Sequence, residues 1–261
     1  MNRDEVTEYL LPVLALALAL LAWEGAVRYY AIAPYILPAP SLVIVTLIKD
    51  WGTLSGSLIV TLSITFEALA AAVVGGVAVA IVFAQWRLVE RAFFPFAVAM
   101  QVTPIVAIAP LLLIYLSSTT AVMVVAFLVA FFPILANTTL GLASAERNLL
   151  DLFSLYRASR WQQLYWLRLP SALPYFLAGL RIGGGLALIG AIVAEIAAGT
   201  AGHGAGLAYR IVESGFRLNI ARMFAALLLI SASGITIYLV LSALSYLLLR
   251  HWHESAQERE T

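Results

Sequence analysis

The sequence has 261 residues, of which 63% are hydrophobic and only 11% charged, and its formal net charge is +1. Soluble domains are about 45–50% apolar and about 25% charged, so this composition excludes an ordinary soluble domain and a disordered chain. The balanced charge gives no reason to expect a nucleic-acid partner, and a chain without cysteine and with three histidines is a poor candidate for a zinc site. We therefore expect an all-α polytopic membrane protein with no metal or cofactor.

About 20 apolar residues cross the hydrocarbon as a helix, so the gaps between charges predict where the spans lie. Residues 10–27 form the first predicted span, and the prolines of 34–40 separate it from a short interfacial helix for which Ser41 is the expected N-cap. The second span is 58–84. Residues 92–145 contain no Lys, Arg, Asp or Glu and are long enough for two crossings, with a hairpin at Ser117–Thr120.

The fifth and sixth predicted spans cover 175–198 and 223–249. About six spans leave both termini on one side of the membrane, and the positive-inside rule favours the cytoplasmic side because ten of the 15 basic residues then fall inside. We expect an N-terminal unit at 1–57, a core at 58–249 with a cytoplasmic loop at 146–174, and a cytoplasmic tail at 250–261.

The loop at 146–174 is unusually long for a membrane protein of this size. Apolar residues recur in it at helical spacing, and Ser159 is expected to cap the second of two short amphipathic helices. Arg157 and Arg160, three apart, are expected to share a helix face, Trp161 has the size of an interface anchor, and Leu169-Pro170 is expected to stop the helix. A hairpin lying on the lipid headgroups remains an alternative for this loop.

The loop sequence resembles a known family. Residues 158–162, 169–175 and 178–182 closely resemble the signature loop of permease subunits of bacterial ABC importers, in the branch for nitrate, sulfonates, taurine and thiamine precursors. The segments 37–41, 103–110 and 193–195 also match habits of that family. The resemblance implies a type I importer permease fold in the inner (plasma) membrane, and a transport function without enzyme activity of its own.

In that family the loop is the coupling helix, which docks on a separate ATP-binding cassette subunit, and a periplasmic binding protein delivers the small polar solute. The resemblance also implies a dimer, which we expect to be a homodimer surrounded by lipid. The family motif begins Glu-Ala-Ala, with Gly six residues after the Glu, where this chain has Asp151-Leu-Phe153 and Arg157. Either a dedicated ATPase partner or weakened coupling would account for this departure. The expected coupling residues are Asp151, Arg157, Arg160, Trp161, Leu169 and Pro170.

Polar groups inside the spans are expected to be functional, because they are costly there. Glu67 in the second span, Gln101 and Thr103 near the prolines of the third, and Glu195 near the end of the fifth are the expected residues of the translocation path. For Glu67 a buried structural carboxylate is the alternative. Glu195 matches a position that is usually acidic in the family, and the resemblance implies a gate or outer-vestibule role there beside the glycine-rich run 199–206, with a plain flexible loop as the alternative. The competing function is a secondary transporter driven by an ion gradient through Glu67 or Glu195.

Overall fold

The computed structural model describes residues 3–199 and 204–250, and every regular element within these residues is a helix, without strands. The predicted all-α fold is therefore confirmed. Eleven α-helices and one π-helical segment follow one another as α1 (Arg3–Tyr29), α2 (Pro40–Lys49), α3 (Trp51–Gln85), α4 (Arg87–Val102), α5 (Ile105–Tyr115), α6 (Ser118–Ala143), α7 (Arg147–Leu155), α8 (Arg160–Gln163), η1 (Leu164–Arg168), α9 (Leu169–Ala198), α10 (Leu207–Phe216) and α11 (Ile220–Leu249). The predicted tail beyond Arg250 and residues 200–203 of the glycine-rich run lie outside the described residues.

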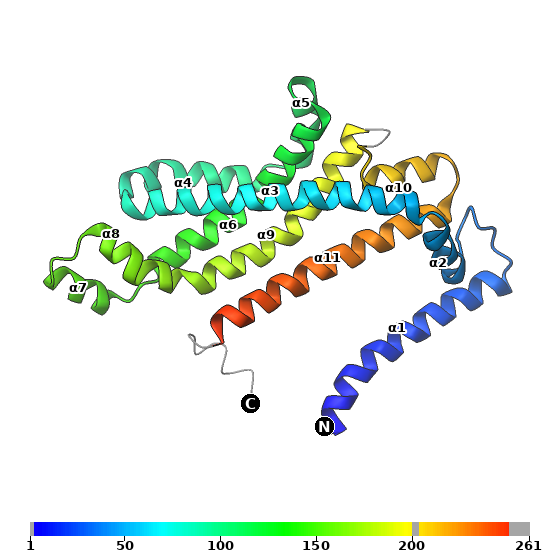
Figure 1. Ribbon diagram of the computed structural model, residues 1–261, viewed down its shortest axis with the longest axis horizontal. Coiled ribbons are helices and arrows are strands. Elements are labelled where there is room, and N and C mark those ends of the chain that lie inside the picture. The colour runs from blue at the N-terminus through cyan, green and yellow to red at the C-terminus, as the bar shows by residue number, and fades with distance from the viewer. Residues whose placement is uncertain (1–2, 200–203, 251–261) are drawn as a thin grey trace.

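The centre of the fold is the packing of α6 between α3 and α9, with α11 lying along α9 (Figure 1). Small residues allow this close approach. A Cβ atom on Gly179 of α9 would lie 2.8 Å from Cβ of Asn137 on α6, and one on Gly190 would lie 2.9 Å from Cα of Ala126. Membrane helices gain little from apolar burial against one another, so contact between backbones contributes much of their association. Gly179 and Gly190 thus serve the packing of α9 against α6.

Five helices are long and apolar enough to cross a membrane, in α1, α3, α6, the helix running from α8 to α9, and α11. The third predicted crossing differs, because it is divided into α4 and α5, of 16 and 11 residues. The break falls at Thr103-Pro104, where Thr103 is extended (φ −67°, ψ 131°). The proline ring disfavours a helical residue before it and supplies no N–H. α5 therefore leaves the direction of α4 and projects from the bundle (Figure 1).

The N-terminal helix α1 stands apart from the bundle and touches it mainly through α2 (Figure 1). The expectation that Ser41 caps α2 is wrong, because the helix begins at Pro40 with Ala39 as its N-cap. The cap comes from α1 instead: the Glu24 carboxylate accepts hydrogen bonds from the backbone N–H of Ser41 at 2.9 Å and from its hydroxyl at 2.7 Å. A carboxylate is favourable at a helix N-terminus, so this contact ties α1 to the start of α2.

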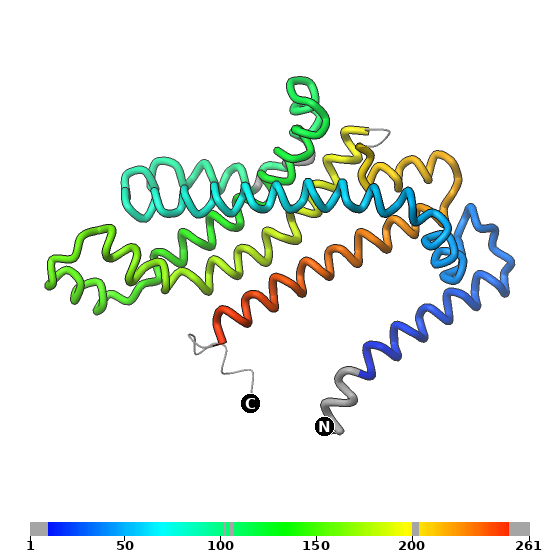
Figure 2. Tube along the Cα trace, viewed as in Figure 1, coloured from blue at the N-terminus to red at the C-terminus, as the bar shows by residue number. Residues whose placement is uncertain are grey.

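The bundle has two distinct ends, which we name for use below. The loop end holds the C-terminus of α3, the start of α4, and α7 and α8; the distal end holds α2 and α10 (Figure 1). α1 runs away from the loop end and α11 runs back toward it (Figure 2). The two termini of the described chain therefore lie toward the same side.

Candidate functional site

The long loop folds as the sequence predicts at its centre, with α7 and α8 joined by a tight turn. The predicted cap of the second helix is confirmed: Ser159 Oγ accepts a hydrogen bond from the N–H of Gln162 at 3.2 Å, and Gln162 Oε1 accepts one from the N–H of Ser159 at 2.7 Å. This reciprocal capping box satisfies two backbone donors that the helix cannot satisfy itself. The start of α8 is thereby held in a defined direction.

The expectation that Arg157 and Arg160 share a helix face is wrong. Arg157 lies in the turn between α7 and α8, whereas Arg160 is the first residue of α8. Arg160 reaches across to the end of α3 and donates to the carbonyl oxygen of Gln85 at 3.4 Å, and Arg168 donates to that of Ala84 at 3.3 Å. Cations are favourable at a helix C-terminus, where carbonyl groups lack partners. Both arginines therefore attach the loop to α3.

Arg157 has a left-handed backbone conformation, with φ of +54°. This is the position at which the family motif has glycine, and a side chain there costs about 1–2 kcal/mol. We expect Arg157→Gly to raise the free energy of unfolding by about 1 kcal/mol, measured by thermal unfolding in detergent. Ala158→Gly is the matched control, because Ala158 is not among the residues with positive φ, and it is expected to give no gain. An equal gain from both variants would contradict the assignment of strain to Arg157.

The expectation that Leu169-Pro170 stops the helix is also wrong, because the chain is helical without interruption from Arg160 to Ala198. The helix accommodates the proline by widening: Leu164–Arg168 form a π-helical turn, and the N–H of Leu169 donates to the carbonyl of Leu164. In a π turn an N–H donates to the carbonyl five residues back, one residue further than in an α-helix. With this shift, the missing N–H of Pro170 leaves fewer carbonyl groups of the helix without a donor. The fifth span is thus continuous with the loop.

The outer surface of the loop is apolar and exposed. Leu155 and Tyr156 are each 81% exposed and Trp161 is 62% exposed. A concavity of about 340 Å³ lies beside them, lined by Leu152, Phe153, Tyr156, Ala158, Gln162 and Trp166. Asp151 is exposed on α7. Exposed aromatic residues around a hollow are typical of protein-binding surfaces, so the loop is suited to binding another protein.

Glu195 is enclosed near the distal end of α9, where it is 2% exposed. Its Oε1 accepts a hydrogen bond from the Thr61 hydroxyl on α3 at 2.8 Å, and its Oε2 accepts one from the N–H of Ala208 in the first turn of α10 at 3.1 Å. Thr61 in turn accepts from the N–H of Leu207 at 2.9 Å. The pair therefore caps α10 from two other helices and joins α3, α9 and α10.

Gly206, the N-cap residue of α10, lies against this pair. A Cβ atom at this position would overlap the carboxylate of Glu195. Only glycine leaves room for the carboxylate to reach the first N–H groups of α10. Part of the predicted glycine-rich run thus serves a packing function beside Glu195.

Three other predicted path residues are exposed on the surface of the single chain: Glu67 on α3, Gln101 on α4, and Thr103 at the break between α4 and α5. The Thr103 hydroxyl donates to the carbonyl of Ala99 at 2.9 Å. Glu67, Gln101 and Thr103 are therefore not enclosed by their own chain, in contrast to Glu195. Their role in transport stays a prediction.

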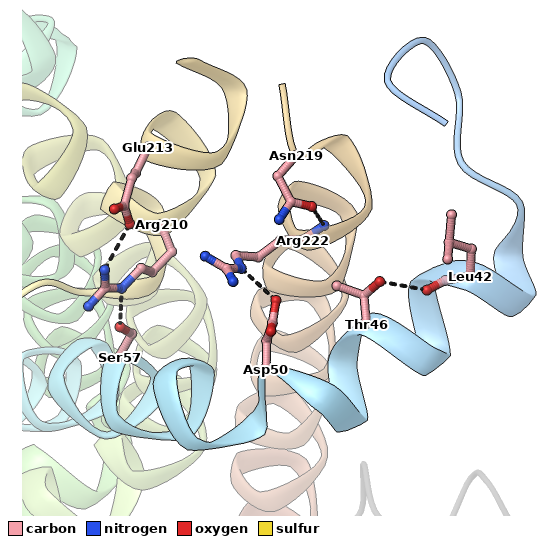
Figure 3. Close-up of polar contacts among 8 residues, drawn as sticks. All are labelled: Leu42, Thr46, Asp50, Ser57, Arg210, Glu213, Asn219 and Arg222. Carbon is pink, nitrogen blue, oxygen red and sulfur yellow. Dashed lines mark hydrogen bonds and ion pairs between the residues drawn. The ribbon is translucent and has the colours of Figure 1, made fainter. Parts of the chain in front are cut away.

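Charged residues at the distal end form a cluster of ion pairs (Figure 3). Arg222 on α11 contacts Asp50 at 2.6 Å, and Arg210 on α10 contacts Glu213 at 2.8 Å while donating to the Ser57 hydroxyl at 2.9 Å. The pKa of Glu213 is lowered from its ordinary value, mainly because its carboxylate accepts a hydrogen bond from Arg210. These contacts fasten α10 and α11 to the start of α3.

Sequence reasoning missed Thr61 and the tie of Arg168 to α3. A signal for Thr61 was present: Ser57, Thr61 and Thr65 recur every four residues, which puts three hydroxyl groups on one helix face, and all three are buried. Arg168 carried no comparable signal, since its acceptor is a backbone carbonyl that the sequence does not mark.

The amino-acid sequence is similar to those of known transport proteins. Residues 72–254 match the family described as the binding-protein-dependent transport system inner membrane component. The riboflavin transport system permease protein of Chloroflexus aurantiacus is 33% identical over 258 residues, covering 94% of this chain and 90% of the relative. The formylaminopyrimidine transport permease protein of Halalkalibacterium halodurans is 34% identical over 240 residues, covering 91% and 94%. The taurine transport system permease protein of Escherichia coli is 29% identical over 250 residues, covering 93% and 89%.

The family match begins in the second half of α3 and extends through α11, so it includes the loop between α6 and α9, Glu195 and α10, while Thr61 lies outside it. The resemblance seen in the loop sequence is therefore confirmed over most of the chain. Proteins of this family are the membrane-spanning subunits of ABC importers, whose ATPase activity resides in separate subunits. The chain belongs to the binding-protein-dependent transport family of inner-membrane components, as a multi-pass permease subunit of an ABC importer.

Proposed function

We propose that this permease imports a small solute by ATP-driven alternating access, with the loop of α7 and α8 docking on the ATP-binding cassette subunit. The single observation that carries this proposal is the exposed apolar surface around Trp161, which continues without a helix break into α9. Closure of the ATPase dimer moves the loop, and α9 transmits that movement into the membrane. Asp151, Arg157, Leu169 and Pro170 support the docked loop, while Arg160 fastens it to α3.

The loop end faces the cytoplasm in this proposal, with both termini on that side. Arginine concentrates at the loop end, where Arg87, Arg147, Arg160 and Arg168 form no ion pairs within residues 3–199 and 204–250. At the distal end, by contrast, Arg210, Arg217 and Arg222 are paired with carboxylates. The positive-inside rule counts Lys and Arg whether or not they are paired, and ten of the 15 basic residues fall on the loop side when both termini lie there. The distal end then faces the periplasm, where a binding protein delivers the solute.

The translocation path lies between two copies of the chain in a homodimer embedded in lipid. Supporting this, the polar residues Glu67, Gln101 and Thr103 are exposed on the single chain, and exposed polar groups inside a membrane are costly unless they face protein or a water-filled path. Glu195 acts at the periplasmic end by holding α10 over the end of α9. Residues 1–57 form a peripheral unit, 58–249 the core, 146–174 its coupling loop, and 250–261 a cytoplasmic tail.

The solute class follows from the relatives. Two of them, each more than 30% identical over more than nine-tenths of this chain, are named for riboflavin and formylaminopyrimidine transport. Both compounds are nitrogen heterocycles, so a heterocycle of this kind is the first solute to test. Taurine, named for a relative of lower identity, is the comparison solute.

Uptake by the complete transporter in proteoliposomes tests the proposal. We expect uptake of a radiolabelled heterocycle to require ATP on the side of the ATPase subunit and the binding protein on the other, and to continue when ionophores collapse the proton and sodium gradients. Uptake that stops with the gradients while ATP is plentiful would instead favour the secondary transporter. Uptake of taurine alone would leave the ATP-driven mechanism standing and change only the solute.

A further inference from the structure

A cavity of about 700 Å³ lies at the loop end, outside the predicted translocation path and apart from the exposed docking surface around Trp161. The C-terminus of α3, the start of α4, the end of α6, the start of α7 and the α8–η1 segment all contribute to its lining. A volume of this size is typical of sites for small ligands. The proposed function makes no use of this cavity.

The lining of the cavity is strongly basic. Four arginines, Arg87, Arg147, Arg160 and Arg168, line it together with one acid, Glu90. Arg160 and Arg168 each donate to a carbonyl of α3. Arg87 and Arg147 make no side-chain hydrogen bond or ion pair to any other residue in the described parts of the chain. Guanidinium groups in this arrangement suit an anion with several oxygen atoms.

Two helices also begin at the cavity, since Arg87 is the first residue of α4 and Arg147 the first of α7. Neither helix has a side-chain cap at its N-terminus. The first N–H groups of a helix lack intrahelical acceptors and favour negative charge nearby. Both helix ends therefore add to the positive potential of the arginines.

A buried hydroxyl group independently points to a ligand site in this cavity. Thr139 on α6 lines the cavity and is 7% exposed, and its Oγ1 has no hydrogen-bond partner among the described residues. Buried hydroxyls in folded proteins are normally hydrogen-bonded. An anionic oxygen in the cavity would accept from this hydroxyl.

The same lining includes the side chains of Trp86, which is 50% exposed, and Leu88, which is 81% exposed. We propose that this cavity binds a phosphate-bearing anion, held by Arg87 and Arg147 and by the Thr139 hydroxyl, with Trp86 and Leu88 beside it. Two sources share this chemistry: the headgroup of an anionic phospholipid, whose acyl chains would lie along the exposed apolar side chains, and a free phosphate anion from the aqueous phase. The site holds the start of α4 and the start of α7 together.

The test uses the complete complex of permease and ATPase subunits in nanodiscs. In the lipid arm, nanodiscs contain phosphatidylcholine and phosphatidylglycerol, and native mass spectrometry counts the lipids that remain bound. In the free-anion arm, nanodiscs contain phosphatidylcholine alone, and calorimetry measures the binding of inorganic phosphate at constant ionic strength. The test variant is Arg87→Gln with Arg147→Gln. The control is Arg91→Gln with Arg181→Gln, which removes the same charge from arginines that do not line the cavity.

We expect one arm to show binding that the test variant weakens about tenfold or more and the control leaves unchanged. Arg87→Lys with Arg147→Lys keeps the charge but loses the paired guanidinium N–H groups. It should bind more tightly than the glutamine variant and less tightly than the wild type, which separates loss of charge from loss of folding. Selective retention of phosphatidylglycerol identifies the lipid headgroup, and saturable binding of phosphate identifies the free anion. The proposal is overturned if neither arm distinguishes the wild type from the test variant, or if the control loses binding equally.

Discussion

Replacing Glu195 by leucine is expected to destabilise the permease more than any other single change at a polar residue of its core. The side chain accepts hydrogen bonds from the Thr61 hydroxyl and from the N–H of Ala208, and leucine accepts neither. Each buried donor left without an acceptor costs about 1–3 kcal/mol. The loss should appear as a lower temperature of unfolding in detergent and as a loss of transport, because α10 loses the hydrogen bond from Ala208 to Glu195 and keeps only the one from Leu207 to Thr61.

Glu67→Leu is the matched control for that change, since it removes the same group from an exposed position on α3. We expect it to leave the unfolding temperature nearly unchanged, whatever its effect on transport. Glu195→Gln should fall between the two, because its amide has one acceptor oxygen where the carboxylate has two. An unfolding temperature for Glu195→Leu equal to that of the wild type would refute the capping role.

Replacing Trp161 by alanine is expected to lower the stimulation of ATP hydrolysis by the binding protein at least about tenfold, while the permease itself stays folded. Trp161 is 62% exposed and lies on the apolar surface of the loop, so the fold gains little from it. Exposed tryptophans that fill a partner's pocket are commonly worth 2 kcal/mol or more in binding. ATP hydrolysis by the reconstituted complex, with and without the loaded binding protein, measures this effect.

Tyr238→Ala provides the control, because Tyr238 is 55% exposed but lies toward the middle of α11, away from both the loop and the distal end. It removes an aromatic side chain at similar exposure and should leave the stimulation intact. Equal losses for the two variants would mean that the aromatic side chain contributes through lipid contact and not through the ATPase. The docking assignment of the loop would then be wrong.

The membrane helices and the loop were predictable because they depend on where charges fall along the chain. Charge-free gaps located α6 and α11 to within a few residues, and the cap at Ser159 followed from its place just before a run of apolar residues at helical spacing. A capping interaction joins residues three or four positions apart. Both partners can therefore be recognised in a single sequence.

Contacts between distant segments were not predictable in the same way. Ser41 has the chemistry of a cap, but Glu24, 17 residues earlier, takes that place. Pro170 looked like a helix stop, but a π turn absorbs it. Arg160 looked like a ligand for a partner, but it donates to Gln85, 75 residues away. In each case the outcome depends on which backbone groups tertiary packing brings near, and propensity does not encode that.

The unbroken helix from Arg160 to Ala198 forms one continuous rod between the loop and the Glu195 cluster. Its 39 residues span about 58 Å at about 1.5 Å per residue. Tilting such a rod by about 5° about one end carries the other end through about 5 Å, which is roughly one helical turn. Glu195 lies three residues from the far end of the rod and holds α10 by a single pair of oxygen atoms. A small rotation at the loop is therefore enough, on geometric grounds alone, to pull those oxygens out of hydrogen-bond range.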